Sequence, residues 1–403
     1  MSVFRTKMSA PSCSIADIER GAYRRGMTDE RQKPEQRKLG LFFREEYPLI
    51  IGLIAAGALL GAGDQVLDDI QHHGKLVLVF VLLFGAVLWS AISVVRHADC
   101  LAIKCGEPYG TLILTLAAIS IEVAMISTAM LHGANNPTLA RDMMFAVIMI
   151  GLNGLVGISL LLGGLRHHEQ TYNLQGASAY VNTIMVLAVL GLVMPNFTTS
   201  RPGPRFSVEQ EIFLAVTSLT LYAVFLLIQT RRHRQYFVGL EVDPTTEHHH
   251  GQARSLGFHL VLMVLYLVVA IVLAEKFAIP LDNCIEHFAM PQACGGTIVA
   301  ALVLAPEALT GITAARRNHL QRAVNVLHGS VLASIGLTIP AVLVIGMITG
   351  RSVTLGIEGG DLPLLLLTLA VSVVTFTTSK TNVLQGCIHL LLFAVFLLLI
   401  FYP

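Results

Sequence analysis

Charged residues are scarce in this 403-residue chain: Asp, Glu, Lys and Arg together make up 13% of it, whereas hydrophobic residues make up 54%. Soluble domains carry about 25% charged residues, so this composition excludes a soluble globular protein and indicates a polytopic membrane protein. The net charge of +1 offers no basic surface for nucleic acid. We therefore expect membrane lipid as a partner and no nucleic acid.

Motifs for nucleotide and hydrolytic chemistry are also missing. The chain has no phosphate-binding loop, no His-Glu-x-x-His pair and no serine elbow. These absences disfavour an ATP-driven pump and an intramembrane protease. We predict that the protein is not an enzyme and has no cofactor.

Cysteine is rare as well, and the six cysteines lack the spacing of a zinc site. They are Cys13, Cys100, Cys105, Cys284, Cys294 and Cys387. Cys284 and Cys294 fall in one predicted loop, where they either form a disulfide in an oxidising compartment or remain free thiols. The sequence leaves both possibilities open.

Long apolar runs fill most of the chain after a polar, basic tail at residues 1–44, which we expect to be cytoplasmic and disordered. Eleven candidate membrane spans follow the tail, and a few of them are short. They cover residues 46–62, 75–95, 110–131, 142–164, 178–194, 209–229, 256–274, 296–314, 323–348, 362–379 and 384–402.

The distribution of Lys and Arg among the short connections orients these spans. If the tail is cytoplasmic, the inside connections carry more Lys and Arg than the outside ones, as the positive-inside rule requires. We therefore predict a multi-pass protein of the bacterial inner (plasma) membrane, with its N-terminus in the cytoplasm and its C-terminus outside.

One carboxylate interrupts the apolar run from Gly295 to Gly311. Burying the charge of Glu307 at mid-bilayer costs about 3 kcal/mol on insertion scales, so its presence there indicates a function. Pro306 removes a backbone donor and leaves helix carbonyls free to face a cavity. An acid beside free carbonyls and nearby hydroxyls suits a cation.

The run from Tyr109 to Ile126 repeats this arrangement around Glu122. Both runs open with Gly-Thr, at Gly110 and Gly296, and each is followed by a Leu-x-Arg sequence that begins the next span. Glu122 lies in the third span and Glu307 in the eighth. Because these spans are five positions apart, an odd number, the two helices cross the membrane in opposite directions.

We therefore predict an all-α membrane protein of about eleven helices, built as two inverted five-helix repeats plus one extra N-terminal helix. The cytoplasmic linker between the repeats contains acids and the run His248 to His250, which is either a metal or pH sensor or a plain polar connection. The predicted boundaries are 1–44 for the tail, 45–74 for the first span with its outer loop, 75–230 for the first repeat, 231–255 for the linker and 256–403 for the second repeat.

Inverted repeats place matched residues face to face near the midplane, so Glu122 and Glu307 should flank one site. Two carboxylates in a low-dielectric site favour holding protons, because desolvation and like-charge repulsion oppose their ionisation. A cation that enters replaces those protons, which is the basis of antiport. Calcium suits such a site because it takes about 6–8 oxygen ligands.

Other oxygens near the two glutamates are candidate ligands. The side-chain candidates are Asn153, Ser330, Ser334, Ser120, Thr115 and Thr310, and the backbone candidates are carbonyls beside Pro306, Gly110 and Gly296. His328 is a candidate proton relay. Each has a structural alternative: a buried acid can be paired or protonated, Asn153 can join two helices, and His328 can pack as a neutral ring. The glycines of span 142–164 predict close helix packing.

Three segments together resemble a known family. The runs from Ala118 to Ala124, from Asn135 to Asp142 and from Leu304 to Gly311 are similar to the ChaA-type calcium/proton antiporters of bacteria, within the cation/calcium exchanger superfamily. The run from Gly329 to Pro340 continues the likeness, which covers most of residues 45–403. The wider superfamily often has a histidine directly after each glutamate, whereas this chain has Val123 and Ala308.

The resemblance implies eleven spans and a central cation site in which Glu122 and Glu307 bind cations and carry protons. It also implies site-lining roles for Asn153 and Ser330. From the residues and the resemblance together we predict a secondary antiporter that exports Ca²⁺, with Na⁺ and K⁺ as further ions, in exchange for H⁺. The alternative is a cation channel or uniport-like conduit that uses the same two acids. Neither stoichiometry nor oligomeric state follows from the sequence.

Overall fold

The structure is a computed structural model that describes residues 46–68, 73–106, 109–132, 137–238 and 255–403. The predicted tail at residues 1–44 and the run His248 to His250 lie outside these residues. The chain divides into two compact units, residues 1–50 and 51–403. Only residues 46–50 of the first unit are described, where α3 begins, so the architecture below is that of the second unit.

Apolar runs form helices because lipid offers no hydrogen-bond partner to an open backbone. Several helices contain short π-helical or 3₁₀ segments, written η. The elements in chain order are α3 (Tyr47–Asp68), α4 (His73–Cys105), α5 (Tyr109–His132), α6 (Leu139–Ile148), η1 (Met149–Leu155), α7 (Val156–His167), β1 (Gln170–Thr171), α8 (Leu174–Ala188), η2 (Val189–Val193), η3 (Met194–Phe197), α9 (Val208–Leu227), η4 (Ile228–Arg232), η5 (Arg234–Tyr236), α10 (Leu256–His287), α11 (Ala293–Arg316), α12 (Leu320–Ala333), η6 (Ser334–Thr338), α13 (Ile339–Thr349), α14 (Asp361–Thr375), β2 (Lys380–Thr381) and α15 (Val383–Phe401).

The predicted spans are confirmed as helices. Within the described residues, eight helical segments are long and apolar enough to cross a membrane, and three shorter apolar helices occupy the remaining predicted spans. The protein is therefore an all-α polytopic membrane protein with eleven helical segments in the predicted order.

Two details of the prediction were wrong. Helix α10 continues to His287, well beyond the predicted end at residue 274, because Pro280 is accommodated inside it and Leu281 and Ile285 continue its buried face. Cys284 and Cys294 therefore lie in helices rather than in a loop, and both are buried free thiols. The tenth predicted span also ends early, because α14 stops at Thr375.

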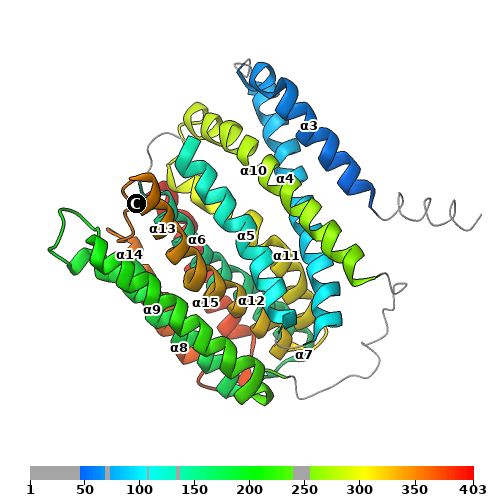
Figure 1. The fold of residues 1–403 in the computed structure, drawn as a ribbon. Helices are drawn as coiled ribbons and strands as arrows, with labels where there is room; N and C mark the ends of the chain where they lie inside the picture. The colour runs from blue at the N-terminus through cyan, green and yellow to red at the C-terminus, as the bar shows by residue number, and fades with distance from the viewer. Residues whose placement is uncertain (1–45, 69–72, 107–108, 133–136, 239–254) are drawn as a thin grey trace, which may run out of the picture. The chain divides into compact units, whose positions relative to one another are not determined.

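Close helix packing fixes the position of α7, which belongs to the predicted span 142–164. Helix α7 lies against α15, where a Cβ atom on Gly157 would come within 3.1 Å of Leu390 N and one on Gly386 within 2.5 Å of Leu161 N. Only glycine allows backbones to approach this closely. The packing role predicted for the glycines of span 142–164 is confirmed at Gly157. Helices α4 and α10 form another long contact (Figure 1).

Helices α5 and α11 run in opposite directions. The extended segment Arg351–Ile357, which we call the strap, meets the end of α5, where the Arg351 side chain donates to the Met130 carbonyl. The strap also receives a hydrogen bond from Arg141 at the start of α6. The start of α11 lies there too, since a Cβ atom on Gly296 would be 2.8 Å from Met143 N in α6. Helix α5 therefore ends where α11 begins.

A short antiparallel pair marks the opposite end of these helices. Strand β1 pairs with β2 through Gln170 opposite Thr381. The Gln170 side chain also donates to the Ala315 carbonyl, at 2.8 Å, in the last turn of α11. The pair therefore joins the connections after α7 and α14 to the end of α11.

Candidate functional site

Two acidic side chains from these opposed helices line one internal cavity. Glu122 projects from the middle of α5 and Glu307 from α11, and both border a cavity of about 210 Å³. Hydroxyl groups of Thr115, Ser330 and Ser334 belong to the same lining. The structure thus brings together both predicted glutamates and three of the predicted oxygen donors.

Glu122 has a fixed neighbour. Its side chain is 1% exposed, and its Oε2 accepts a hydrogen bond from Ser334 Oγ at 2.7 Å. Ser334 begins the π-helical segment η6, and such wider turns are frequent at functional sites because they redirect side chains. The other oxygen, Oε1, is buried without a hydrogen-bond partner among the described residues.

Glu307 has different surroundings from Glu122. It is half-buried, follows the proline within α11, and its buried Oε2 has no hydrogen-bond partner among the described residues. An unpartnered buried carboxylate oxygen costs free energy unless something binds it. Both glutamates therefore present unused acceptor oxygens, which is the chemistry that a cation or a proton can satisfy.

The cavity leads from the glutamates toward the end of the helices where β1 and β2 lie. Its lining there includes Gln229 in η4 and Asn325 near the start of α12. Gln229 Nε2 donates to Tyr180 Oη at 2.7 Å, and Asn325 Nδ2 donates to the Phe237 carbonyl at 2.5 Å. This part of the cavity is therefore lined by polar groups that are already held in place.

The strap lies at the other end of α5 and α11. Its residues 353–357 are buried although they form neither helix nor strand, so their backbone polar groups need partners. Thr354 N donates to the Pro137 carbonyl and Ile357 N to the Leu192 carbonyl, each at 2.9 Å. The strap is thus bonded to the first half of the chain.

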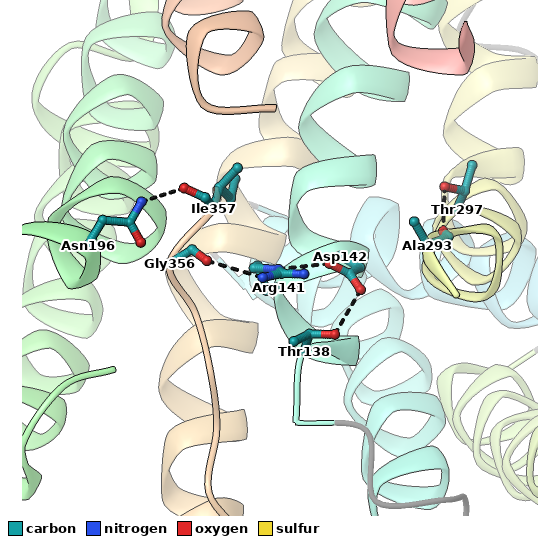
Figure 2. A network of polar contacts seen from close by, with 8 residues as sticks. All are labelled: Thr138, Arg141, Asp142, Asn196, Ala293, Thr297, Gly356 and Ile357. Atoms are coloured by element: carbon teal, nitrogen blue, oxygen red, sulfur yellow. Dashed lines mark hydrogen bonds and ion pairs between the residues drawn. The ribbon is translucent and has the colours of Figure 1, made fainter. Parts of the chain in front are cut away.

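Side chains of the first half also bond the strap (Figure 2). Arg141 Nη1 donates to the Gly356 carbonyl at 3.3 Å, and its Nε pairs with Asp142 at 2.8 Å. Asn196 donates to the Ile357 carbonyl. Figure 2 shows Arg141 lying between the strap and Asp142. Arg141, at the start of α6, thus bonds the strap to the first half of the chain.

Other predicted residues lie elsewhere. Asn153 is fully buried in η1 and is bonded to α14 and α15 rather than lining the cavity. Ser120 and Thr310 donate to carbonyls of their own helices, at 2.6 and 3.2 Å. His328 is fully buried, bonds its own helix through Nδ1, and packs edge-on against Phe376.

The helix-breaking residues have separate places. Pro306 is accommodated within α11, directly before Glu307. Gly110 lies in the first turn of α5, and Gly296 lies at the contact between α11 and α6. Sequence reasoning missed Tyr180, Gln229 and the strap. Of these, only Gln229 had a signal in the sequence, because it is a glutamine near the end of an apolar span.

These observations define a helical membrane protein in which two acidic side chains from opposed helices border one internal cavity. The chain belongs to the family described as sodium/calcium exchanger protein, whose model matches residues 75–231 and 258–402. This match covers both halves and leaves out the tail and the first span.

Individual relatives cover most of the chain. The sodium-potassium/proton antiporter ChaA of Escherichia coli (strain K12) is 39% identical over 361 residues, which are 89% of this chain and 96% of that protein. The Ca²⁺/H⁺ antiporter ChaA of Bacillus subtilis (strain 168) is 24% identical over 294 residues, covering 73% and 81%. The solved structure of YfkE has a TM-score of 0.67 at 17% identity and covers 88% of this chain and 100% of that one, which shows the shared fold.

Proposed function

We propose that this protein is a secondary active antiporter that exports calcium from the cytoplasm in exchange for protons, with sodium and potassium as further cations. The observation that carries the proposal is the pair Glu122 and Glu307, which border one cavity from opposed helices and have unused carboxylate oxygens. The relatives support it, since one is named a sodium-potassium/proton antiporter and another a Ca²⁺/H⁺ antiporter.

Access from one end at a time distinguishes this mechanism from a pore. The cavity leads to the β1–β2 end, whereas the strap is bonded across the other. An antiporter needs a site that opens to the two sides in turn, and a channel needs a continuous path. The arrangement therefore favours antiport over the channel alternative.

We further propose that residues 75–230 and 256–403 are inverted repeats, with residues 45–74 added before them and residues 231–255 linking them. Asn153 follows Leu139 by the same number of residues as Ser334 follows Leu320, and both lie in π-helical segments. With the N-terminus in the cytoplasm and the C-terminus outside, the cavity faces the cytoplasm and the strap faces outward.

In this proposal the two carboxylates hold either protons or one cation. An entering calcium ion passes Gln229 and Asn325, meets the hydroxyls of Thr115, Ser330 and Ser334, and displaces the protons from the glutamates. The carboxylate and hydroxyl oxygens among the lining residues suit the ligand preference of calcium. Opening of the strap end then releases the cation outside, and protons reload the carboxylates there.

Everted membrane vesicles test this function. Respiration acidifies the vesicle interior, and calcium, sodium or potassium chloride is then added in turn while a fluorescent dye reports the pH gradient. We expect cation-dependent loss of the gradient, with Glu307→Gln vesicles showing none. If no cation collapses the gradient in the parent vesicles, antiport is wrong, and cation-dependent current without proton movement would replace it with a channel.

A further inference from the structure

The amide of Asn153 is held by a buried network that joins η1 to α14 and α15. Its Nδ2 donates to Thr368 Oγ1 in α14 at 2.8 Å, and its Oδ1 lies 3.1 Å from His389 Nδ1 in α15. His389 Nε2 lies 3.1 Å from Thr375 Oγ1. Asn153, Thr368 and His389 are each 0% exposed.

The chemistry of these groups determines which atom is the hydrogen-bond donor in each pair. An amide oxygen only accepts, so the hydrogen lies on His389 Nδ1 and is donated to Asn153 Oδ1. His389 Nε2 then accepts from the hydroxyl of Thr375. Both polar atoms of the Asn153 side chain are therefore engaged, and the oxygen is directed toward α15.

The opposite half shows what Asn153 is kept from doing. Ser334 has the corresponding place in η6, and its hydroxyl reaches Glu122 at 2.7 Å. Segment η1 packs against α11, the helix of Glu307, yet Glu307 Oε2 has no partner among the described residues. Glu307 thus lacks the kind of neighbour that Ser334 provides to Glu122.

We propose that His389 is a positioning residue that controls whether Asn153 serves the cation site. By accepting the His389 hydrogen bond, the amide oxygen of Asn153 is withheld from a cation at Glu307 while the cavity is open to the β1–β2 end. Binding from that side is thereby kept weak enough for release. This inference rests on the proposed function, because Asn153 acts here as a potential cation ligand.

The matched variants His389→Leu and His389→Gln test the proposal in the everted vesicles. Leucine removes the donor and frees the Asn153 oxygen, so we expect the KM for calcium to fall about fivefold, the effect of one net hydrogen bond, with kcat falling by a similar factor. Glutamine retains an N–H donor, so its KM should stay near that of the parent. A lower kcat with an unchanged KM in His389→Leu would indicate only a packing role and overturn the proposal.

A double-mutant cycle separates action through Asn153 from a general effect. In an Asn153→Ala background the His389→Leu change should leave KM unaltered, since the oxygen that it releases is gone. A KM shift that persists in that background contradicts the proposal. If His389→Leu does not assemble in the membrane, His389→Phe replaces it, because phenylalanine keeps a planar ring and has no N–H to donate to Asn153 Oδ1.

Failure of the proposed function gives a different result. Parent vesicles without calcium-dependent proton movement refute the antiporter and this inference together. Parent vesicles that exchange normally, with His389→Leu and His389→Phe both at the parental KM, refute the positioning role alone.

Discussion

Glu122 and Glu307 lie at matched places in the two halves of the chain, but their surroundings differ. Glu122 accepts a hydrogen bond from Ser334, the residue at the start of η6. Glu307 receives no such bond from Asn153, whose amide is directed to Thr368 and His389. One acid is therefore hydrogen-bonded to a neighbouring side chain and the other has an unpartnered oxygen among the described residues, a difference that suits a site that must bind and release.

The largest effect should come from removing either carboxylate. Glu122→Gln and Glu307→Gln keep the shape of the side chain but can neither carry a proton nor balance a cation charge, so each should abolish exchange in everted vesicles. The comparison between the halves predicts that both are needed. Exchange at the parental rate in either variant would contradict the paired-acid site.

The next effect concerns the neighbours of the two acids. Ser334→Ala removes a hydrogen bond to a charged group, so we expect the KM for calcium from the cavity side to rise about tenfold. Asn153→Ala should raise it less, because Asn153 is held away from Glu307 in this conformation. Initial rates over a calcium series in everted vesicles measure both. A larger rise in the KM for calcium in Asn153→Ala than in Ser334→Ala would contradict the predicted order.

A smaller effect is expected at the strap. Arg141→Gln removes the guanidinium that bonds the Gly356 carbonyl, so the strap should open about fivefold more often, as the loss of one net hydrogen bond allows. A Leu355→Cys reporter is placed in a chain whose native cysteines are replaced, and a membrane-impermeant maleimide is added to intact cells. Faster labelling with Arg141→Gln supports an outward-facing strap. An unchanged labelling rate counts against it.

The smallest effect should follow from Lys380→Gln at the opposite end. The Lys380–Glu169 pair is 3.0 Å long, but its side chains are 62% and 58% exposed. Water and salt screen such a pair, so its loss should cost less than about 0.5 kcal/mol. Thermal unfolding in detergent should show almost no shift. A shift larger than that of Arg141→Gln would mean that the β1–β2 end is the more firmly closed one.

Hydropathy and the cost of buried charge predicted much of this molecule. The eleven spans follow from long apolar runs, and Glu122 and Glu307 are found because an acid in such a run is expensive. The extension of α10 was missed because the apolar run stops at the charged residues Glu275 and Lys276, whereas the helix continues past them and past Pro280 to His287.

The missed parts depend on contacts between distant residues. A π-helical turn redirects side chains, so spacing alone did not show that Ser334 reaches Glu122 while Asn153 contacts His389. The strap reads in the sequence as a short apolar connection, and its role depends on partners such as Pro137 and Leu192, which are far away in the chain.

Proton release on calcium binding tests the central claim most directly. Purified protein in a weakly buffered solution is titrated with calcium while a dye reports pH. The account predicts that calcium binding releases protons from the parent protein, and that both Glu122→Gln and Glu307→Gln lose this release together with calcium binding. Calcium binding of parental affinity without proton release, or full release that persists in either variant, would contradict a shared site for cations and protons.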